Sequence, residues 1–198
     1  MKTLVLASKS PARKNVLAGA GLVFEVVPGN VDEDAIKTQM RDASASCEDA
    51  ALALAEAKAR DVAAKTPGCF VLGADQILEC DGVWFDKPGN IETARRQLHD
   101  LSGHTHKLIS ALCLVYDEEK IWSHIGTAEL TMRFLSDGFI DDYLEKAGVD
   151  ILQSVGTYQL EGLGSQLFDS VEGDFFTVLG LPLMPLLKVL RQQGVVAT

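Results

Sequence analysis

The stretch TLVLASKSPARK at residues 3–14 decides how this chain begins to fold. Residues 3–7 are almost continuously apolar and favour β-structure, which predicts a buried strand. Ser10 followed by Pro11 is typical of a helix N-cap and of the first helical position. Residues 3–14 therefore predict a strand that leads directly into a helix, the first unit of a mixed α/β fold.

The rest of the chain continues this pattern of strands and helices. Strands are predicted over residues 24–27, 70–74, 77–80, 83–85, 107–116 and 121–134. Helices are predicted over residues 10–21, 46–65 and 90–101, from Ser136 onward and from Pro182 onward. Residues 31–34, VDED, are expected to form an acidic loop, and the glycine-rich residues 155–174 receive no assignment. We expect an α/β fold with a mixed twisted sheet and flanking helices.

Composition limits the possible functions. The chain has 198 residues, of which 28 are acidic and 18 basic, and its formal net charge is -10. This length suits a single domain over residues 1–198, with room for two lobes around a cleft. The acidic excess disfavours binding of polymeric nucleic acid, which needs a basic face. A small phosphorylated ligand remains compatible, because a few local cations suffice to hold it.

The cysteines and the apolar runs indicate the compartment. None of the four cysteines forms a C-x-x-C pair, so reduced thiols are favoured over a disulfide framework or a zinc site. The apolar run after Lys2 is too short for a signal peptide and is soon followed by Lys9 and Arg13. No run reaches the length of a membrane span. We expect a soluble cytoplasmic protein with no membrane partner.

The junction between the first strand and the first helix carries an anion-binding signal. Ser8, Ser10 and Arg13 lie where unpaired backbone N–H groups and the helix dipole favour a negative charge. Arg13 and Lys14 are unfavourable in the first helical turn unless an anion such as phosphate binds there. The alternative is that Ser10 only caps the helix and that the cations are solvated.

Further candidate residues are scattered along the chain. Asp75, in GADQ at residues 73–76, follows a buried strand, where it could hold a metal or accept a proton from water. Glu33 offers the oxygen donor that Mg²⁺ and Mn²⁺ prefer. Lys58, on the alanine-rich helix, and Lys87, before a proline, are candidate cations. The structural alternatives are a turn-forming aspartate, a solvated acidic loop and ordinary surface lysines.

Other motifs mainly exclude functions. His104 and His106 share one strand face, but no third ligand of the usual zinc type stands near them in the sequence. We therefore interpret these histidines as structural or hydrogen-bonding residues. The chain contains no P-loop, no G-x-G-x-x-G fingerprint and no G-x-S-x-G elbow. These absences argue against a P-loop NTPase, a dinucleotide enzyme and an α/β-hydrolase.

Eight short segments, taken in order, resemble the Maf family of nucleoside triphosphate pyrophosphatases. They are LASKSPAR at residues 6–13, VDE at 31–33, AEAKA at 55–59, GADQ at 73–76, DKP at 86–88, LSGHTH at 101–106, EGLG at 161–164 and GLPL at 180–183. Each is weak alone, but their joint order over nearly the whole chain is specific. The resemblance implies one Maf-like domain, with two lobes around a deep cleft, similar to the inosine triphosphate pyrophosphatases and commonly a homodimer.

The resemblance also implies a reaction and its residues. Water attacks the α-phosphorus of a nucleoside triphosphate with the help of Mg²⁺ or Mn²⁺ and releases pyrophosphate. The family's proton acceptor falls on Asp75, which would position the metal and water together with Glu33. The residues expected to bind the triphosphate or to offset the charge of the leaving pyrophosphate are Ser8, Ser10, Arg13, Lys58 and Lys87.

Three positions bear on the choice of base. Gln76 and Glu161 resemble the family's 7-methyl-GTP branch, whereas the pyrimidine branch has threonine and glutamine there. Ala12 replaces the arginine of the pyrimidine branch, although it is smaller than expected in the 7-methyl-GTP branch. The side chain of Glu161 would accept two hydrogen bonds from guanine; its alternative is a structural loop carboxylate. Two further functions remain open, a broad-specificity pyrophosphatase and a nucleotide-binding regulator of septum formation.

Overall fold

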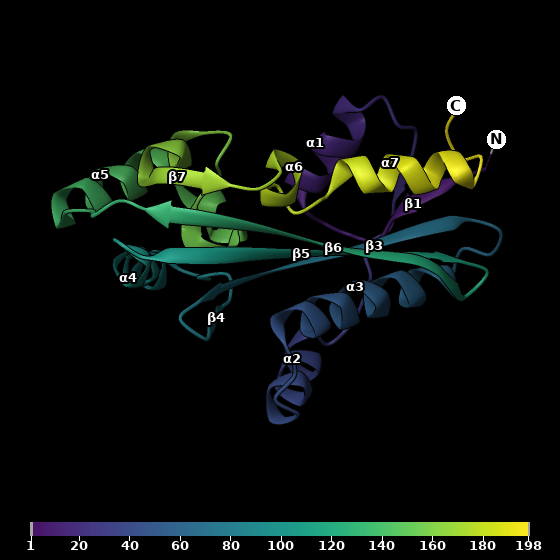
Figure 1. The fold of residues 1–198 in the computed structure, drawn as a ribbon, viewed down its shortest axis with the longest axis horizontal. Helices are drawn as coiled ribbons and strands as arrows, with labels where there is room; N and C mark the ends of the chain where they lie inside the picture. The colour runs from purple at the N-terminus through teal and green to yellow at the C-terminus, as the bar shows by residue number, and fades with distance from the viewer. Residues whose placement is uncertain (1, 198) are drawn as a thin grey trace. The chain divides into compact units, whose positions relative to one another are not determined.

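The computed structural model describes residues 2–197, which form a mixed sheet with helices on its faces (Figure 1). The seven strands are β1 Leu4–Leu6, β2 Glu25–Val26, β3 Phe70–Cys80, β4 Val83–Phe85, β5 Thr105–Tyr116, β6 Glu119–Met132 and β7 Phe168–Glu172. Their order is β2-β1-β3-β5-β6-β7, and β4 pairs with β3. β1 runs parallel to β2 and β3, whereas β4 and β7 pair antiparallel with their neighbours. The predicted α/β class is confirmed.

The predicted helices fall close to their expected positions, whereas α2 and α6 were not predicted. The α-helices are α1 Pro11–Gly19, α2 Glu33–Asp42, α3 Cys47–Ala63, α4 Ile91–Leu101, α5 Asp137–Ala147, α6 Phe175–Val178 and α7 Leu183–Gln192. The short 3-10 helices are η1 Val149–Gln153, η2 Val155–Thr157 and η3 Leu163–Leu167. The predicted N-caps Ser10, Ser46, Asn90 and Ser136 all accept a backbone N–H of the first turn, as N-cap side chains should.

The chain divides into two compact units. Unit 1 comprises the residues up to Gln76, Ile109–Gly126 and the residues from Phe175 onward. Unit 2 comprises Ile77–Leu108 and Thr127–Asp174. The long strands β3, β5 and β6 each contribute residues to both units.

Unit 1 has helices on both faces of its strands. α1 and α7 lie on one face, and α3 lies on the other (Figure 1). The core on the α1 and α7 side is a cluster of aliphatic side chains around Phe70. Its other members are Leu4, Leu6, Val16, Leu17, Leu72, Ala74, Leu112, Leu114, Leu181, Leu183, Leu186, Val189 and Leu190. Burial of these side chains stabilises the unit by removing apolar surface from water.

A glycine allows α3 to approach the other face closely. An ideal Cβ on Gly73 would lie 2.0 Å from the carbonyl oxygen of Ala55 and 2.9 Å from the Cβ of Ala59. Because no side chain fits there, the small residues of α3 rest directly on β3. The next residue on the same face of β3 is Asp75, so this close contact also brings Asp75 next to α3.

Unit 2 is organised around α4. This helix packs against α5 and against η1 and η2. Tyr143 donates a hydrogen bond to the carbonyl oxygen of Thr157 (3.1 Å), and Thr157 donates one to the side chain of Gln97 (3.0 Å). Residues 155–174, which received no prediction, contain η2, η3 and β7. Their glycines and short turns explain why no clear periodicity marks them.

Two sequence-based expectations were wrong. The acidic residues 31–34 were expected in a loop, but α2 begins at Glu33 with Asp32 as its N-cap. Aspartate is a strong N-cap and acidic residues favour the first turn, so the acidic run marks a helix start. Residues 70–74 and 77–80 were expected as separate strands, but β3 continues through Asp75. None of the helices within residues 2–197 has the length and apolar character needed to cross a bilayer.

Candidate functional site

The site begins where β1 ends beside β3. The parallel pairing of these strands runs from Leu4–Phe70 to Leu6–Leu72, and the amide of Ala7 donates to the carbonyl oxygen of Leu72. Beyond that point β3 has lost its β1 neighbour, although it remains a strand itself. Asp75 therefore lies at a rim that the end of β1 creates, and not at the end of its own strand, where the sequence analysis had placed it.

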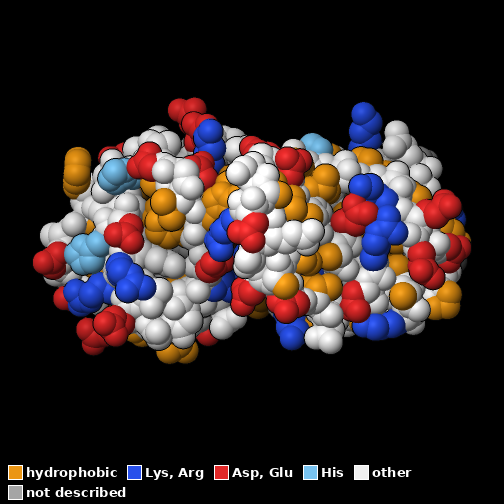
Figure 2. All heavy atoms as spheres, turned by 90° about the horizontal axis from the view of Figure 1, so that it is seen from below, with side chains coloured by type: hydrophobic (Ala, Val, Ile, Leu, Met, Phe, Trp, Pro, Cys, Tyr) orange, Lys and Arg blue, Asp and Glu red, His pale blue; other side chains and the backbone are white. Residues whose placement is uncertain are grey.

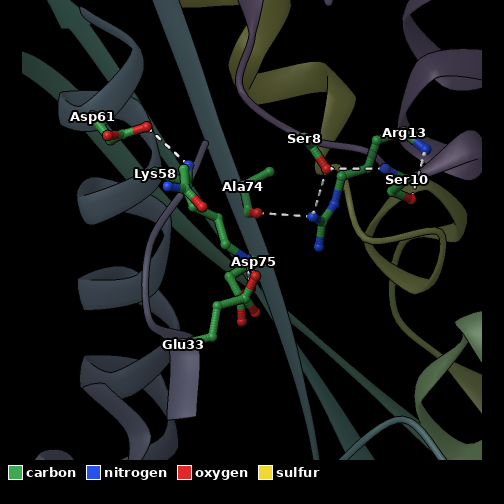
Figure 3. Close-up of polar contacts among 9 residues, drawn as sticks. Ser8, Ser10, Arg13, Glu33, Lys58, Asp61, Ala74 and Asp75 are labelled. Carbon is green, nitrogen blue, oxygen red and sulfur yellow. Dashed lines mark hydrogen bonds and ion pairs between the residues drawn. The ribbon is translucent and has the colours of Figure 1, made fainter. Parts of the chain in front are cut away.

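Lys58 joins two carboxylates at this rim. Its ammonium nitrogen lies 2.6 Å from Oδ1 of Asp75 and 2.9 Å from Oε1 of Glu33. Figure 3 shows the three side chains converging from α3, β3 and the start of α2. Lys58 and Asp75 are buried, whereas the side chain of Glu33 is about half exposed. The structure thus groups three predicted site residues that are far apart in the sequence.

The loop before α2 is held against α3. The amide of Asn30 donates to Oδ2 of Asp61 on α3 (2.8 Å), the contact drawn at Asp61 in Figure 3. An ideal Cβ on Gly29 would lie 3.2 Å from the Cα of Lys58, so the loop backbone passes directly beside that lysine. These two contacts place the start of α2, and with it Glu33, close to the ammonium group.

Arg13 is buried on the opposite side of β3 (Figure 3). Its Nε donates to the carbonyl oxygen of Gly180 (2.9 Å), and its Nη1 donates to the carbonyl oxygen of Ala74 (2.7 Å) and to Oγ of Ser8 (3.2 Å). Burial lowers the pKa of the guanidinium, while the charges of Asp75 and Glu33 oppose this shift. Arg13 therefore links three segments of unit 1 within the field of the acidic pair.

The two serines shape the turn from β1 into α1. Ser10 caps α1 by accepting from the amide of Arg13 (3.4 Å), and Ser8 accepts from the amide of Ser10 (3.2 Å). Lys9 and Lys14 are exposed, whereas Arg13 points inward. The sequence predicted a group of cations at this junction. Of Lys9, Arg13 and Lys14, only the side chain of Arg13 is buried.

Gln76 is fixed by hydrogen bonds within unit 1. Its amide nitrogen donates to Oγ of Ser110 (2.9 Å) and to the carbonyl oxygens of Thr177 (3.2 Å) and Val178 (3.0 Å). Ser110 also donates to the carbonyl oxygen of Thr177 (2.8 Å). The sequence analysis did not identify Ser110. Nothing in the residues around this serine indicates that it contacts Gln76 and Thr177, which lie far from it in the sequence.

The remaining predicted residues are Ala12, Lys87 and Glu161. Ala12 is half-buried in the first turn of α1. Lys87 is exposed in the segment between β4 and α4, and Glu161 is exposed in the turn between η2 and η3. Both belong to unit 2. Their predicted roles toward phosphate and base stay predictions.

The donor set at Lys58 suits a hard divalent cation. The carboxylates of Glu33 and Asp75 both lie within ion-pair distance of the Lys58 ammonium nitrogen. Their oxygens are therefore already arranged around a positive charge. Mg²⁺ and Mn²⁺ prefer such oxygen ligands and commonly bind through one or two carboxylates plus substrate phosphates. The residues therefore fit the predicted divalent ion.

Comparisons with known proteins give consistent results. A family model described as Maf-like protein matches residues 3–193. The 7-methyl-GTP pyrophosphatase of Mesorhizobium japonicum is 51% identical over 98% of this chain and 97% of its own length. The nucleoside triphosphate pyrophosphatase of Paramagnetospirillum magneticum is 52% identical over 96% of this chain and 98% of its own.

Further matches include another sequence and a solved structure. The 7-methyl-GTP pyrophosphatase of Brucella abortus is 48% identical over 96% of each chain. Among solved structures, a nucleoside-triphosphatase (dITP/XTP pyrophosphatase) of Mycobacterium abscessus aligns with 98% of this chain and 96% of its own. The TM-score is 0.42 and the identity 19%, values too low to support an inference.

Proposed function

The chain belongs to the Maf family, and from this premise we propose that it hydrolyses a nucleoside triphosphate to the monophosphate and pyrophosphate, with 7-methyl-GTP as its preferred substrate. The observation that carries the proposal is the buried pair of Lys58 and Asp75 beside Glu33, with Arg13 across β3. A structural protein of this size gains little from a buried lysine and carboxylate, because burying charge is costly. In a phosphate-transfer site, the lysine can offset negative charge on phosphate and the carboxylate can accept a proton from water.

Each of these residues has a role in the reaction. The Asp75 carboxylate accepts a proton from water as the water oxygen attacks the α-phosphorus. The bond between the α-phosphorus and the bridging oxygen breaks, and that oxygen leaves with pyrophosphate. Lys58 offsets the negative charge that develops on the phosphate oxygens, and so does Lys87. Glu33 and Asp75 would hold Mg²⁺ or Mn²⁺, whose charge would offset that of the triphosphate.

Arg13 and the two serines form the second part of the proposed site. Nε and Nη1 of Arg13 donate to protein oxygens. We assign Nη2 to a phosphate oxygen, because an arginine N–H bond to phosphate is strong. Ser8 and Ser10 hold the backbone of the turn in place for the same ligand. The other bonds of Arg13 fix the direction in which Nη2 points.

Three residues carry the proposed preference for a purine. Glu161 would accept hydrogen bonds from N1–H and the exocyclic amine of guanine, a pattern that uracil and thymine do not offer. The 7-methyl group makes the ring cationic, which favours a carboxylate partner further. The amide nitrogen of Gln76 already donates hydrogen bonds within unit 1, so we assign its side-chain oxygen to the ligand. Ala12 leaves space at the start of α1.

The test is pyrophosphate release with Mg²⁺ or Mn²⁺ from 7-methyl-GTP, GTP, dTTP, UTP and ITP. We expect the highest kcat/KM for 7-methyl-GTP and no release without a divalent cation. Binding without turnover would instead indicate a nucleotide-dependent regulator, and equal rates on all five would indicate a broad-specificity enzyme.

The Glu161→Gln variant tests base recognition. It should lose the preference for 7-methyl-GTP over UTP, because the amide does not accept both hydrogen bonds from guanine. An unchanged preference would show that Glu161 does not recognise the base.

Two properties of the whole molecule complete the proposal. We propose a homodimer in the cytoplasm, as in the family that the sequence resembles. On the face drawn in Figure 2, acidic and basic side chains are interspersed, which agrees with a small nucleotide as partner in place of a nucleic acid polymer. Light scattering coupled to size-exclusion chromatography tests the dimer, and a mass of one chain would contradict it.

A further inference from the structure

Three potential metal ligands meet at one end of unit 2. Cys80 ends β3, Asp81 begins the turn into β4, and His104 directly precedes β5. Nδ1 of His104 lies 3.1 Å from Oδ2 of Asp81, and Sγ of Cys80 lies 3.9 Å from the same oxygen. The ligand atoms of the three residues all lie within 4.8 Å of one another. His106 is not part of this cluster, and the two partners of His104 come from the hairpin, more than twenty residues earlier in the sequence.

The sheet fixes this arrangement. Cys80 pairs with Val83 across the hairpin, and Asp81 adopts a positive φ of 51°, as an Asp-Gly hairpin turn requires. β3 and β5 are neighbours in the sheet, and Sγ of Cys80 lies 3.8 Å from the carbonyl oxygen of Thr105, the residue after His104. Strand pairing, and not the conformation of one flexible loop, therefore sets the separation of the three side chains.

The donor atoms select a particular kind of ion. A thiol, an imidazole and a carboxylate are the ligands that Zn²⁺ uses in proteins, at about 2.0–2.3 Å each, which places tetrahedral ligands about 3.3–3.8 Å apart. The separations of 3.1 Å and 3.9 Å lie within about 0.2 Å of this range. A thiol ligand disfavours Mg²⁺ and Ca²⁺, which take oxygen donors. The side chains of His104 and Asp81 are 53% and 74% exposed, so the open side of the cluster faces solvent.

The charge around Cys80 also favours a cation. Burial raises the pKa of its thiol, and the carboxylates of Asp81, Glu79 and Asp100 act electrostatically on the thiol and raise this pKa further. A bound divalent ion would offset these three negative charges.

We propose that Cys80, Asp81 and His104 form a binding site for Zn²⁺ or a similar transition-metal ion, with a fourth position open to water. The site lies in unit 2 and does not depend on the proposed hydrolase function. It also differs in kind from the oxygen-donor pair of Glu33 and Asp75, because only here does a thiol take part. The expected ion is therefore different from the one that serves the phosphate site.

Titration with Co²⁺ tests the proposal, because Co²⁺ bound to a thiolate has an absorption band that oxygen and nitrogen ligands do not produce. The reduced full chain without a polyhistidine tag should bind one Co²⁺ with this band, and Zn²⁺ should displace it. Cys80→Ser should lose the band, whereas Cys69→Ser, which changes another free cysteine, should keep it. A missing band in the wild type, or an equal band in Cys80→Ser, would overturn the proposal.

A second set of variants guards against misfolding of the Cys80 variant. His104→Ala and Asp81→Asn change exposed side chains, and each should weaken Zn²⁺ binding at least about tenfold in competition with a chromophoric chelator. Asp75→Asn should bind as tightly as the wild type, which separates this site from the phosphate site. Zn²⁺ should raise the Tm of the wild type but not of His104→Ala. Equal affinity in wild type and His104→Ala would overturn the assignment.

Discussion

Helix α3 takes part in two lysine–carboxylate pairs of equal length in very different surroundings. Lys58 lies 2.6 Å from Asp75, and Glu56 lies 2.6 Å from Lys120. The side chains of the first pair are 11% and 8% exposed, whereas those of Glu56 and Lys120 are 24% and 39% exposed. Distance alone does not distinguish a functional pair from a surface one, but burial does.

The exposed pair behaves as a surface network. Glu56 also contacts Arg60 (2.8 Å), which donates to the carbonyl oxygen of Glu118 (2.7 Å). The hydrogen bond to Lys120 lowers the pKa of Glu56, although partial burial opposes this shift. Water and salt screen such pairs, so each contributes little to stability. The buried pair has less screening and lies beside Glu33, and this is why we place the chemistry there.

The strongest test of this comparison is exchange of one carboxylate from each pair for its amide. Asp75→Asn should lower kcat for pyrophosphate release by about 10²–10⁴-fold, because the amide does not accept the proton from water. Glu56→Gln should leave kcat within about twofold of the wild type. Activity assays with 7-methyl-GTP measure both, and comparable losses in the two variants would show that burial does not mark the reactive pair.

Removal of one lysine from each pair compares the stability of the two environments. Lys58→Met leaves Asp75 buried without its cation, so the free energy of unfolding should fall by about 3 kcal/mol or more. Lys120→Met should change it by at most about 1 kcal/mol. Urea unfolding followed by circular dichroism gives both values. An equal loss of unfolding free energy in the two variants would show that water screens the Lys58–Asp75 pair as strongly as the Glu56–Lys120 pair.

Gly73→Ala tests the close contact between α3 and β3 that buries Lys58. The new methyl group would meet the Ala55 carbonyl oxygen, so we expect a loss of about 1–3 kcal/mol in the free energy of unfolding. The matched control is Gly138→Ala on α5, where an added Cβ meets nothing within 4 Å. That variant should be neutral or gain up to about 1 kcal/mol. A Gly73→Ala protein as stable as the wild type would show that α3 does not need this contact.

His106 extends the comparison of buried and exposed groups to unit 2. Nε2 of this buried histidine lies 2.7 Å from the Tyr158 hydroxyl, and within residues 2–197 its Nδ1 has no hydrogen-bond partner. Burial lowers the pKa of His106 to about 4. Between that value and the ordinary pKa near 6.5, the unfolded chain binds a proton that the folded protein does not. The free energy of unfolding should therefore fall as the pH is lowered from about 6.5 to 4.

The expected slope is at most about 1.4 kcal/mol for each pH unit. His106→Gln has no imidazole to protonate, so its stability relative to its own value at pH 8 should fall less steeply over this range. Urea unfolding at half-unit steps of pH measures both curves. Identical slopes in wild type and variant would mean that other groups dominate the acid response.

The short-range structure could largely be predicted from the sequence, because it depends on neighbouring residues. Ser10 and Pro11 began α1, and Asn90 and Ser136 capped their helices as predicted. The Asp-Gly turn at residues 81–82 joined β3 and β4. The acidic run at residues 31–34 also contains a local helix signal, because Asp32 caps α2 and Glu33 and Asp34 occupy its first turn. Local propensity and capping are encoded within a few residues, so they are visible without the fold.

The sequence by itself determined the mixed α/β class and the candidate residues, whereas only the tertiary structure decided which of them meet. Lys58, Asp75 and Glu33 come together because Gly73 lets α3 rest on β3 and because β1 ends at Leu6. The partners of Cys80 and Gln76 depend in the same way on which strands pair. Such contacts join residues tens of positions apart, and sheet pairing and burial, not local propensity, fix them.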